Sequence, residues 1–242
     1  MRYAIVGGTN LDEIPVPSRE QPVVTPYGDV IVCRGTLDDG QDVVFLPRHG
    51  IFERVDPPDI NYRANIYALY LLGVTHVIGL SSVGACDYSY KLGTVCLIND
   101  FIDFTKNRIL SFERKHRLAL HTGMEDVCCP DLSDKLERLI LNHGLHYSGR
   151  AVYACTEGPR FETAAEVRMF RMLGAQIIGM TLVPEAPLAR DLGLHYAAIG
   201  IISNYCTGMT SYVSDADIKG VITEMRESVF EICFQLIRQN RE

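Results

Sequence analysis

The stretch HYAAIGIISNYCTG (residues 195–208) has the pattern of a buried strand that ends in polar groups. Small and apolar side chains dominate its first nine residues, and the isoleucines among them favour a strand. Asn204 and Cys206 then follow before Gly208. In α/β proteins ligands bind beyond the carboxyl ends of such strands. The stretch therefore predicts a buried strand whose end contributes a carboxamide to a ligand site.

The rest of the chain alternates strands with helices. Strands rich in valine and isoleucine are predicted at residues 3–8, 29–35, 42–48, 75–82, 94–100, 150–158, 175–181 and 195–203. Helices are predicted at residues 60–73, 131–144 and 163–174, each stopping at a glycine, and from residue 214 onward. The third opens with a capping box of Thr163 and Glu166. The last has an apolar stripe at Ile218, Val221, Met225, Val229, Ile232 and Leu236.

This alternation predicts a single α/β domain over residues 1–242, with a central, largely parallel or mixed sheet flanked by helices. The length of 242 residues and the hydrophobic content of 47% suit one sizeable core. The net charge is −7 without a basic block, which argues against nucleic-acid binding. The longest apolar stretch contains His76 and is too short to span a membrane.

The cysteines and the start of the chain suggest a cytoplasmic protein. The eight cysteines include no C-x-x-C pair, so a zinc site is not expected. Most lie in apolar strands or helices, which favours buried, reduced thiols in a cytoplasmic protein. The apolar run in MRYAIVGG (residues 1–8) is too short for a signal peptide.

The predicted strand ends gather groups that suit an anion. Glycines and hydroxyls recur there, and one end carries an adjacent arginine and histidine. Backbone N–H groups, a guanidinium fork, an imidazole donor and hydroxyls together predict a phosphate cradle without a metal. The pattern matches neither the dinucleotide fingerprint nor the P-loop. The residues of this predicted cradle are Thr9, Arg48, His49, Ser81, Ser82 and Thr181.

Seven blocks occur in order along the chain: TPYG (25–28), LPRHG (46–50), DINYRANIYAL (59–69), NDFIDFTKNR (99–108), TEGPRFETAAE (156–166), GMTLVPEAPLAR (179–190) and SNYCTG (203–208). Together they resemble the trimeric purine nucleoside phosphorylase and methylthioadenosine phosphorylase family. The resemblance runs from Gly7 to the last helix. Its most specific part is GPRFET at residues 158–163 followed by MT and PE at residues 180–185.

The resemblance implies a reaction in which inorganic phosphate cleaves the N-glycosidic bond of a purine nucleoside. The products are the free base and a ribose 1-phosphate, and phosphate is a co-substrate, so no cofactor or metal is expected. A phosphate anion beneath the sugar stabilises the oxocarbenium character of the transition state. No pair of carboxylates is needed, unlike in ordinary glycoside hydrolysis. The task of the enzyme is then mainly positioning.

The resemblance also assigns roles to residues. It implies phosphate contacts for the cradle residues named above, and catalytic roles for Asn204 and His49. His121 matches a histidine that reaches the neighbouring subunit in the family, so a homotrimer or a dimer of trimers is implied. The positions implied to contact the nucleoside are Phe161, Glu162, Met180, Asn204, Cys206, Asp215 and His121.

The family divides at the position of Asn204. Adenine-type members have an Asp there, within a D-x-D arrangement whose second position is Cys206 here. An Asn amide donates to the O6 acceptor of a 6-oxopurine, whereas an ionised Asp faces that oxygen lone pair to lone pair. Asn204 therefore predicts 6-oxopurine nucleosides, either inosine and guanosine or 5′-methylthioinosine. The alternative in the same class is a methylthioadenosine phosphorylase.

Two positions depart from the family pattern. Glu53 stands where a second histidine is common, which leaves open a non-catalytic nucleoside-binding homologue. Asp215 stands where the family contacts the 5′ substituent of the sugar. A carboxylate accepts a hydrogen bond from a 5′-hydroxyl and gains nothing from a thioether. YACTEGPRFET and SNYCTG nevertheless resemble the methylthioinosine-type members, so both 5′ groups stay open.

Overall fold

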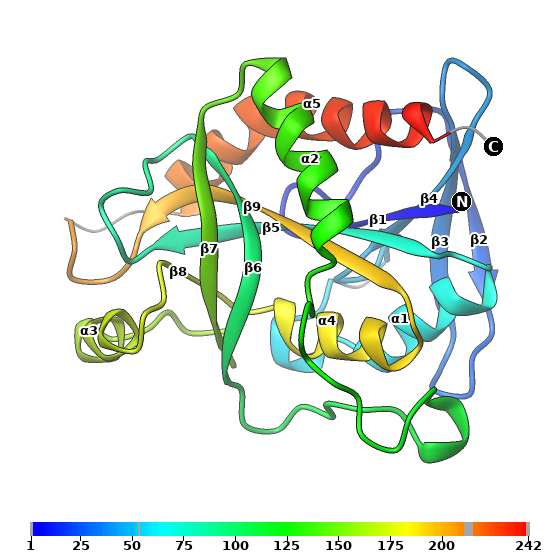
Figure 1. Cartoon of the computed structure of the whole chain (residues 1–242), viewed down its shortest axis with the longest axis horizontal. Helices are drawn as coiled ribbons and strands as arrows, with labels where there is room; N and C mark the ends of the chain where they lie inside the picture. Colours follow the sequence, from blue (N-terminus) through cyan, green and yellow to red (C-terminus); the bar gives the residue numbers. More distant parts are fainter. Residues whose placement is uncertain (1, 53, 211–214, 241–242) are drawn as a thin grey trace.

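The computed structural model describes residues 2–52, 54–210 and 215–240. Glu53 lies outside these residues, and Asp215 is described only as the first residue of the last helix. Over the described residues the chain forms one α/β domain with a nine-stranded mixed sheet (Figure 1), which confirms the predicted fold class. The strands are β1 (Tyr3–Gly7), β2 (Ser18–Val23), β3 (Val30–Thr36), β4 (Asp42–Pro47), β5 (His76–Ala85), β6 (Val95–Phe104), β7 (Tyr147–Thr156), β8 (Ile177–Gly179) and β9 (His195–Tyr205).

The sheet combines an open part with a closed part. The strand order is β2-β3-β4-β1-β5-β8-β7-β6-β9, and β5 also pairs with β9. Strands β5, β8, β7, β6 and β9 therefore close into a ring, and β1, β4, β3 and β2 extend from β5. Strand β1 runs parallel to β4 and β5, and β5 runs parallel to β9. The carboxyl ends of these four strands consequently meet at one edge.

Helices cover both sides of this sheet (Figure 1). They are α1 (Tyr62–Leu71), α2 (Pro130–His143), α3 (Ala164–Met172), α4 (Leu182–Asp191) and α5 (Asp215–Gln239), with short 3-10 turns at Pro57–Asp59 and Arg114–His116. Helices α1 and α4 pack on one face around residues such as Ile66 and Leu188. Helices α2 and α5 pack on the other, around residues such as Leu136 and Phe230. Helix α3 lies beside the ring.

Helix starts and ends follow the predicted local signals. Thr163 accepts a hydrogen bond from the backbone N–H of Glu166, and the Glu166 carboxylate accepts one from the N–H of Thr163, so the capping box is confirmed. Helix α2 ends at Gly144, whose φ of 78° is left-handed and favours glycine. The stripe on α5 is confirmed where it enters the core, at Met225, Val229, Ile232 and Leu236.

Two elements were not predicted, and one is much shorter than predicted. Strand β2 has the sequence SREQPV and is mostly exposed, because it is an edge strand paired with β3 alone. Helix α4 contains Pro184 and Pro187, and Val183 within it has non-helical backbone angles. Strand β8 spans three residues, because the chain leaves the sheet at Met180 to begin α4.

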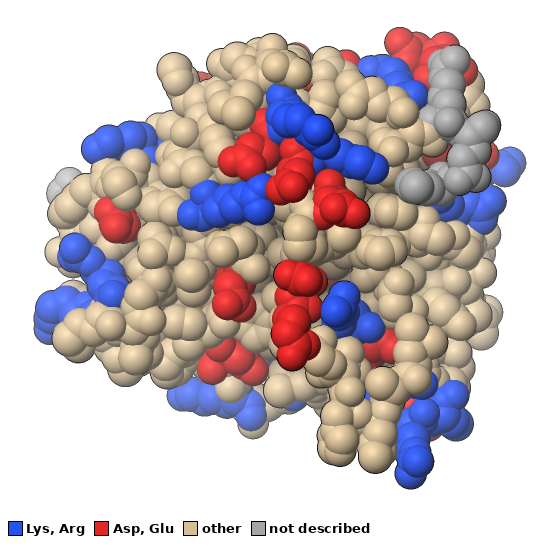
Figure 2. Space-filling model, in the orientation of Figure 1, with Lys and Arg blue, Asp and Glu red and all other residues tan. Residues whose placement is uncertain are grey.

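The surface carries charges of both signs, and the cysteines form no disulfides. On the face drawn in Figure 2, lysine and arginine side chains are interleaved with aspartate and glutamate. One surface arginine, Arg150, pairs with both Asp134 and Glu137. All eight cysteines are free thiols; six are buried, and Cys33 and Cys129 are half-buried. Among the described residues, no helix combines the length and apolar character that a membrane span requires.

Candidate active site

A cleft of about 710 Å³ opens at the edge where the carboxyl ends of β1, β4, β5 and β9 meet. Residues from the loops before α3 and α4 and from the start of α5 complete its wall. It brings together side chains that lie far apart in the sequence. The predicted site residues that line it are Thr9, Arg48, His49, Ser81, Ser82, Phe161, Glu162, Met180, Thr181, Asn204 and Cys206.

Arg48 follows β4 and is only 2% exposed. Its Nε donates to Glu185 Oε2 at 2.6 Å, and its Nη2 donates to Glu185 Oε1 at 2.8 Å. Its Nη1 donates to the carbonyl of Leu80 at 2.9 Å. The predicted use of the fork for a phosphate does not fit this geometry, because Glu185 already occupies the bidentate edge. Arg48 Nη1 lies beside Gly8. Its second hydrogen is the one that Arg48 can donate to a ligand in the cleft.

The ion pair of Arg48 and Glu185 is buried on both sides. Burial by itself lowers the pKa of Arg48, but the charge and the hydrogen bonds of Glu185 outweigh it and raise that pKa above its usual value. The Tyr196 hydroxyl adds a third hydrogen bond, donating to Glu185 Oε1 at 2.7 Å. Arg48 is therefore charged, but its charge is largely balanced inside the protein.

His49 differs from the predicted second donor. Its Nδ1 lies 2.8 Å from the carbonyl oxygen of Val55, and a carbonyl only accepts, so Nδ1 carries the proton of the neutral ring. Burial lowers the pKa of His49, and the charge of Arg48 lowers it further, which outweighs the bond to Val55. The ring is therefore neutral at neutral pH. Its Nε2, which faces the space beside Gly8, is an acceptor.

Hydroxyls from two elements meet at the same end of the cleft. Ser81 Oγ in β5 and Thr181 Oγ1 before α4 are buried and lie 3.4 Å apart. Thr181 occupies the N-cap position of α4, and its side chain makes no capping hydrogen bond. The backbone N–H of Thr181 donates a hydrogen bond to the Tyr153 hydroxyl at 3.2 Å. The hydroxyls of Ser81 and Thr181 are thus held on rigid elements and can donate to an oxyanion.

Ser82 points differently from Ser81, since successive side chains of a strand alternate between its faces. Its Oγ lies 2.8 Å from Ser203 Oγ in the neighbouring strand β9. Ser203 in turn donates to Asn204 Oδ1 at 2.9 Å, and Asn204 Nδ2 donates to the carbonyl of Tyr205 at 3.1 Å. The side chain of Ser82 is therefore connected to the carboxamide at the end of β9.

A buried carboxylate shares the cleft with this carboxamide. Glu162 is 7% exposed and accepts a hydrogen bond from Thr156 Oγ1 at 2.6 Å. Burial raises the pKa of Glu162, and the bond from Thr156 opposes that rise only in part. Phe161 beside it is about half exposed at the rim. Cys206 is buried, and burial raises the pKa of its thiol, so it presents a neutral group.

Two predicted positions are not among the described residues that line the cleft. His121 is exposed, in the segment between β6 and α2, and does not line the cleft. The side chain of Asp215 lies outside the described part. Ile218 and Lys219, three and four residues later on α5, do line the cleft, as helical spacing would have indicated. Further lining residues that were not predicted are Asp56, Pro57, Tyr205, Thr207 and Thr210.

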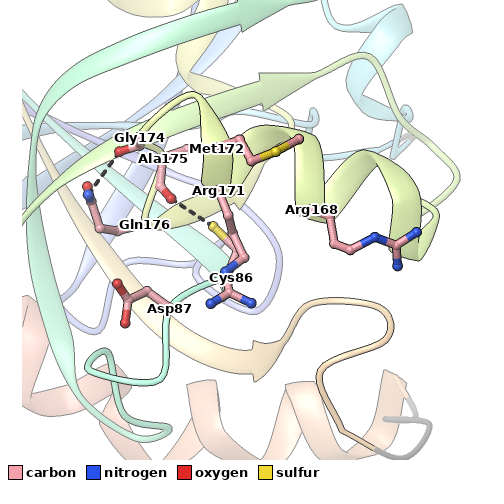
Figure 3. A pocket seen from close by; sticks show the side chains of 8 residues that line it. All are labelled: Cys86, Asp87, Arg168, Arg171, Met172, Gly174, Ala175 and Gln176. Atoms are coloured by element: carbon pink, nitrogen blue, oxygen red, sulfur yellow. Dashed lines mark hydrogen bonds between the residues drawn. The ribbon is translucent and has the colours of Figure 1, made fainter.

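A second pocket, of about 450 Å³, lies between the end of β5 and the end of α3 (Figure 3). The Cys86 thiol in it donates to the carbonyl of Ala175 at 3.1 Å, and burial raises the pKa of this thiol to about 12. Cys86 is therefore no thiolate nucleophile at neutral pH. Arg168 extends away from the other labelled side chains. This pocket lacks the convergence of buried polar groups found in the main cleft.

Comparison with known proteins agrees with this geometry. The family model of the phosphorylase superfamily matches residues 2–238. The chain belongs to the phosphorylase superfamily. The 6-oxopurine nucleoside phosphorylase of Pyrococcus furiosus is 44% identical over 216 residues, which cover 86% of this chain and 81% of that relative. The probable S-methyl-5′-thioinosine phosphorylase of Methanocaldococcus jannaschii is 38% identical over 229 residues, which cover 94% of this chain and 88% of that relative.

Solved structures of the superfamily share the whole fold. The methylthioadenosine phosphorylase from an antarctic soil metagenomic library superimposes with a TM-score of 0.88 at 31% identity. The match covers 99% of this chain and 88% of that one. The chain is thus similar both to 6-oxopurine and to methylthioadenosine enzymes, and the residues of its own cleft have to decide between these substrates.

Proposed function

We propose that this chain cleaves the N-glycosidic bond of 6-oxopurine nucleosides with inorganic phosphate, giving the free base and a ribose 1-phosphate. The proposal rests chiefly on the pairing of a carboxamide, Asn204, with a buried carboxylate, Glu162, in one cleft. The names of the Pyrococcus and Methanocaldococcus relatives support it. The enzyme needs no cofactor in this scheme, since phosphate is a co-substrate.

Asn204 and Glu162, with Phe161 and Cys206, form what we term the base end of the cleft. A 6-oxopurine presents an acceptor at O6 and a donor at N1–H, whereas adenine presents a donor at N6 and an acceptor at N1. The Asn204 N–H suits O6, and the Glu162 carboxylate suits N1–H. Adenine would leave both protein groups unpaired, and such mismatches discriminate strongly between substrates.

Thr9, Arg48, His49, Ser81 and Thr181 form the phosphate end. Hydroxyls and one N–H of Arg48 donate to the oxyanion. The neutral His49 accepts a hydrogen bond at Nε2 from the protonated oxygen of hydrogen phosphate. This contact sets the orientation of the anion and turns an unprotonated oxygen toward the sugar.

Catalysis then follows from the two ends of the cleft. An unprotonated phosphate oxygen forms a bond to C1′ as the C1′–N9 bond breaks, and the electron pair of that bond stays on the purine. The phosphate charge stabilises the positive charge that develops on the sugar. Asn204 stabilises the negative charge that develops on the base by donating to O6. Met180 also lines the cleft, and the proposal assigns it the packing contact with the sugar.

The experiment that tests this function is a substrate panel. Inosine, guanosine, adenosine and their 5′-methylthio analogues are assayed with and without phosphate. Phosphate-dependent release of hypoxanthine or guanine is expected. Faster release of adenine would instead identify the methylthioadenosine phosphorylase alternative, and hypoxanthine binding without any cleavage would identify a non-catalytic homologue. The panel also decides between a 5′-hydroxyl and a 5′-methylthio group.

We further propose a homotrimer or dimer of trimers, working in the cytoplasm. The resemblance to trimeric enzymes supports the assembly, and the exposed position of His121 leaves it accessible to a second copy. The free cysteines suit a reducing compartment. Light scattering after size exclusion tests the assembly. A trimer whose nucleoside KM rises in His121→Ala would support a contribution across the interface.

A further inference from the structure

Ser203 does not line the cleft itself, but it lies between two side chains that do. It is 2% exposed, and its Oγ lies 2.8 Å from Ser82 Oγ and 2.9 Å from Asn204 Oδ1. The carbonyl of Val83 is a more distant acceptor at 3.3 Å. A buried hydroxyl held between two polar neighbours is well placed to fix the orientation of one of them.

The direction of each hydrogen bond follows from the backbone. The carbonyl of Tyr205 can only accept, so the end of the Asn204 amide that faces it must be the nitrogen. The oxygen of the amide then faces Ser203, which donates its single hydrogen to it. Ser203 can consequently only accept from Ser82. The chain of donors runs from Ser82 through Ser203 to Asn204.

This direction decides what the amide offers to a ligand. Asn204 Nδ2 has two hydrogens, and among the described residues Tyr205 accepts one of them. Asn204 and Gly84 both line the cleft, and Nδ2 lies 3.1 Å from the position that a Cβ on Gly84 would occupy, so we infer that the second hydrogen is directed to the cleft. The amide therefore presents a donor to the base, and its acceptor oxygen is turned toward Ser203.

We propose that Ser203 is a specificity-determining positioning residue, whose hydroxyl fixes the amide of Asn204 with its donor toward purine position 6. The inference rests on the proposed function and deepens it. Without the hydroxyl, the amide oxygen loses its donor, and only the hydrogen bond to the Tyr205 carbonyl still opposes a turn of that oxygen toward the cleft. A turned amide accepts from the 6-amino group of adenine and repels O6. Ser203 thus sustains the preference for a 6-oxo over a 6-amino group.

The test compares kcat/KM for inosine and adenosine, or for the methylthio pair if the panel selects it. Ser203→Ala should lower the 6-oxo to 6-amino ratio by about tenfold, the size expected for one buried hydrogen bond left unmade. Ser203→Thr keeps the hydroxyl and should restore the ratio. Ser203→Cys, similar in size but a weak donor, should lower it, and serves as the second variant if Ser203→Ala does not fold.

A double-mutant cycle separates positioning from a general structural role. Asn204→Asp has no amide nitrogen to orient, so adding Ser203→Ala to it should leave the base ratio within about twofold. An equal loss of kcat/KM for both bases in Ser203→Ala, with the ratio unchanged, would overturn the proposal. Failure of the proposed function is recognised separately, because the wild-type enzyme would then show no phosphate-dependent preference for 6-oxopurines in the first place.

Discussion

Arg48 and Glu185 form an ion pair wholly inside the protein, next to the phosphate end of the cleft. Removing one member of such a pair leaves an uncompensated buried charge, whereas replacing both is often close to neutral for stability. Arg48 therefore has two separable roles. It neutralises Glu185, and in the proposed function it also offers one N–H to the phosphate anion.

The first prediction separates these roles. Arg48→Ala should raise the KM for phosphate sharply and should also lower the free energy of unfolding by about 3–5 kcal/mol. Arg48→Met combined with Glu185→Gln removes both charges and keeps an acceptor for the Tyr196 hydroxyl. The double variant should regain most of the stability while its phosphate KM stays high. Denaturant unfolding and phosphate kinetics measure both quantities; a normal phosphate KM in the double variant would refute the contact.

The second prediction concerns pH and the base end. The raised pKa of Glu162 means that its carboxylate is lost at a higher pH than in an exposed glutamate. Protonation removes the acceptor for N1–H, so hypoxanthine binding should weaken as the pH falls through a value above 4.5. Calorimetric titrations with hypoxanthine at a series of pH values measure this change in affinity. Glu162→Gln has no carboxyl to titrate and should lack the decline; an identical decline in that variant would assign it to another group.

At the scale of the elements, the sequence predicted apolar strands and capped helices well. Periodicity and capping are local signals, so strand β9 and the box at Thr163 could be read directly. Strand β2 is polar and α4 contains two prolines, so tertiary contacts decide both. The partners of Arg48 and His49 could not be predicted for the same reason. Those partners are Glu185 for Arg48 and Val55 for His49, and only the folded chain shows which donor and acceptor atoms remain for a ligand.

The third prediction uses the close approach of β5 to β9. A Cβ on Gly84 would lie 2.8 Å from Cys206 Sγ and 3.1 Å from Asn204 Nδ2, so alanine there must displace the amide. Gly84→Ala should lower kcat/KM for inosine by about tenfold, as expected for one disturbed hydrogen bond. The phosphate KM should change little. Gly220→Ala on α5, which meets open space, is the matched control, and equal losses in both variants would refute the steric mechanism.

For the whole molecule, the sheet topology places the two ends of the cleft on different sets of elements. The phosphate end is built by the loops after β1 and β4 and by the start of α4, while the base end is built by β9 and the loop before α3. Strand β5 contributes to both through Ser81 and Gly84. Because these strands belong to one continuous sheet and the loops connect to it, binding at either end should stabilise the entire domain.

The fourth prediction follows from this arrangement and needs no turnover, since hypoxanthine and phosphate do not react with each other. A ligand at a hundred times its Kd stabilises the native state by about 2.7 kcal/mol. For a chain of this size that corresponds to a rise in Tm of roughly 5–10 °C. Each ligand alone should raise the Tm, and both together should raise it further.

Variants at the two ends should remove these shifts selectively. Asn204→Ala should abolish the shift with hypoxanthine and keep the shift with phosphate. The double variant of Arg48 and Glu185 should do the reverse, because its stability is largely retained while the N–H contact to the anion is lost. Differential scanning calorimetry measures all four combinations. If either variant lost both shifts together, the two ends would not be separate subsites, and the division of the cleft drawn from its lining residues would be wrong.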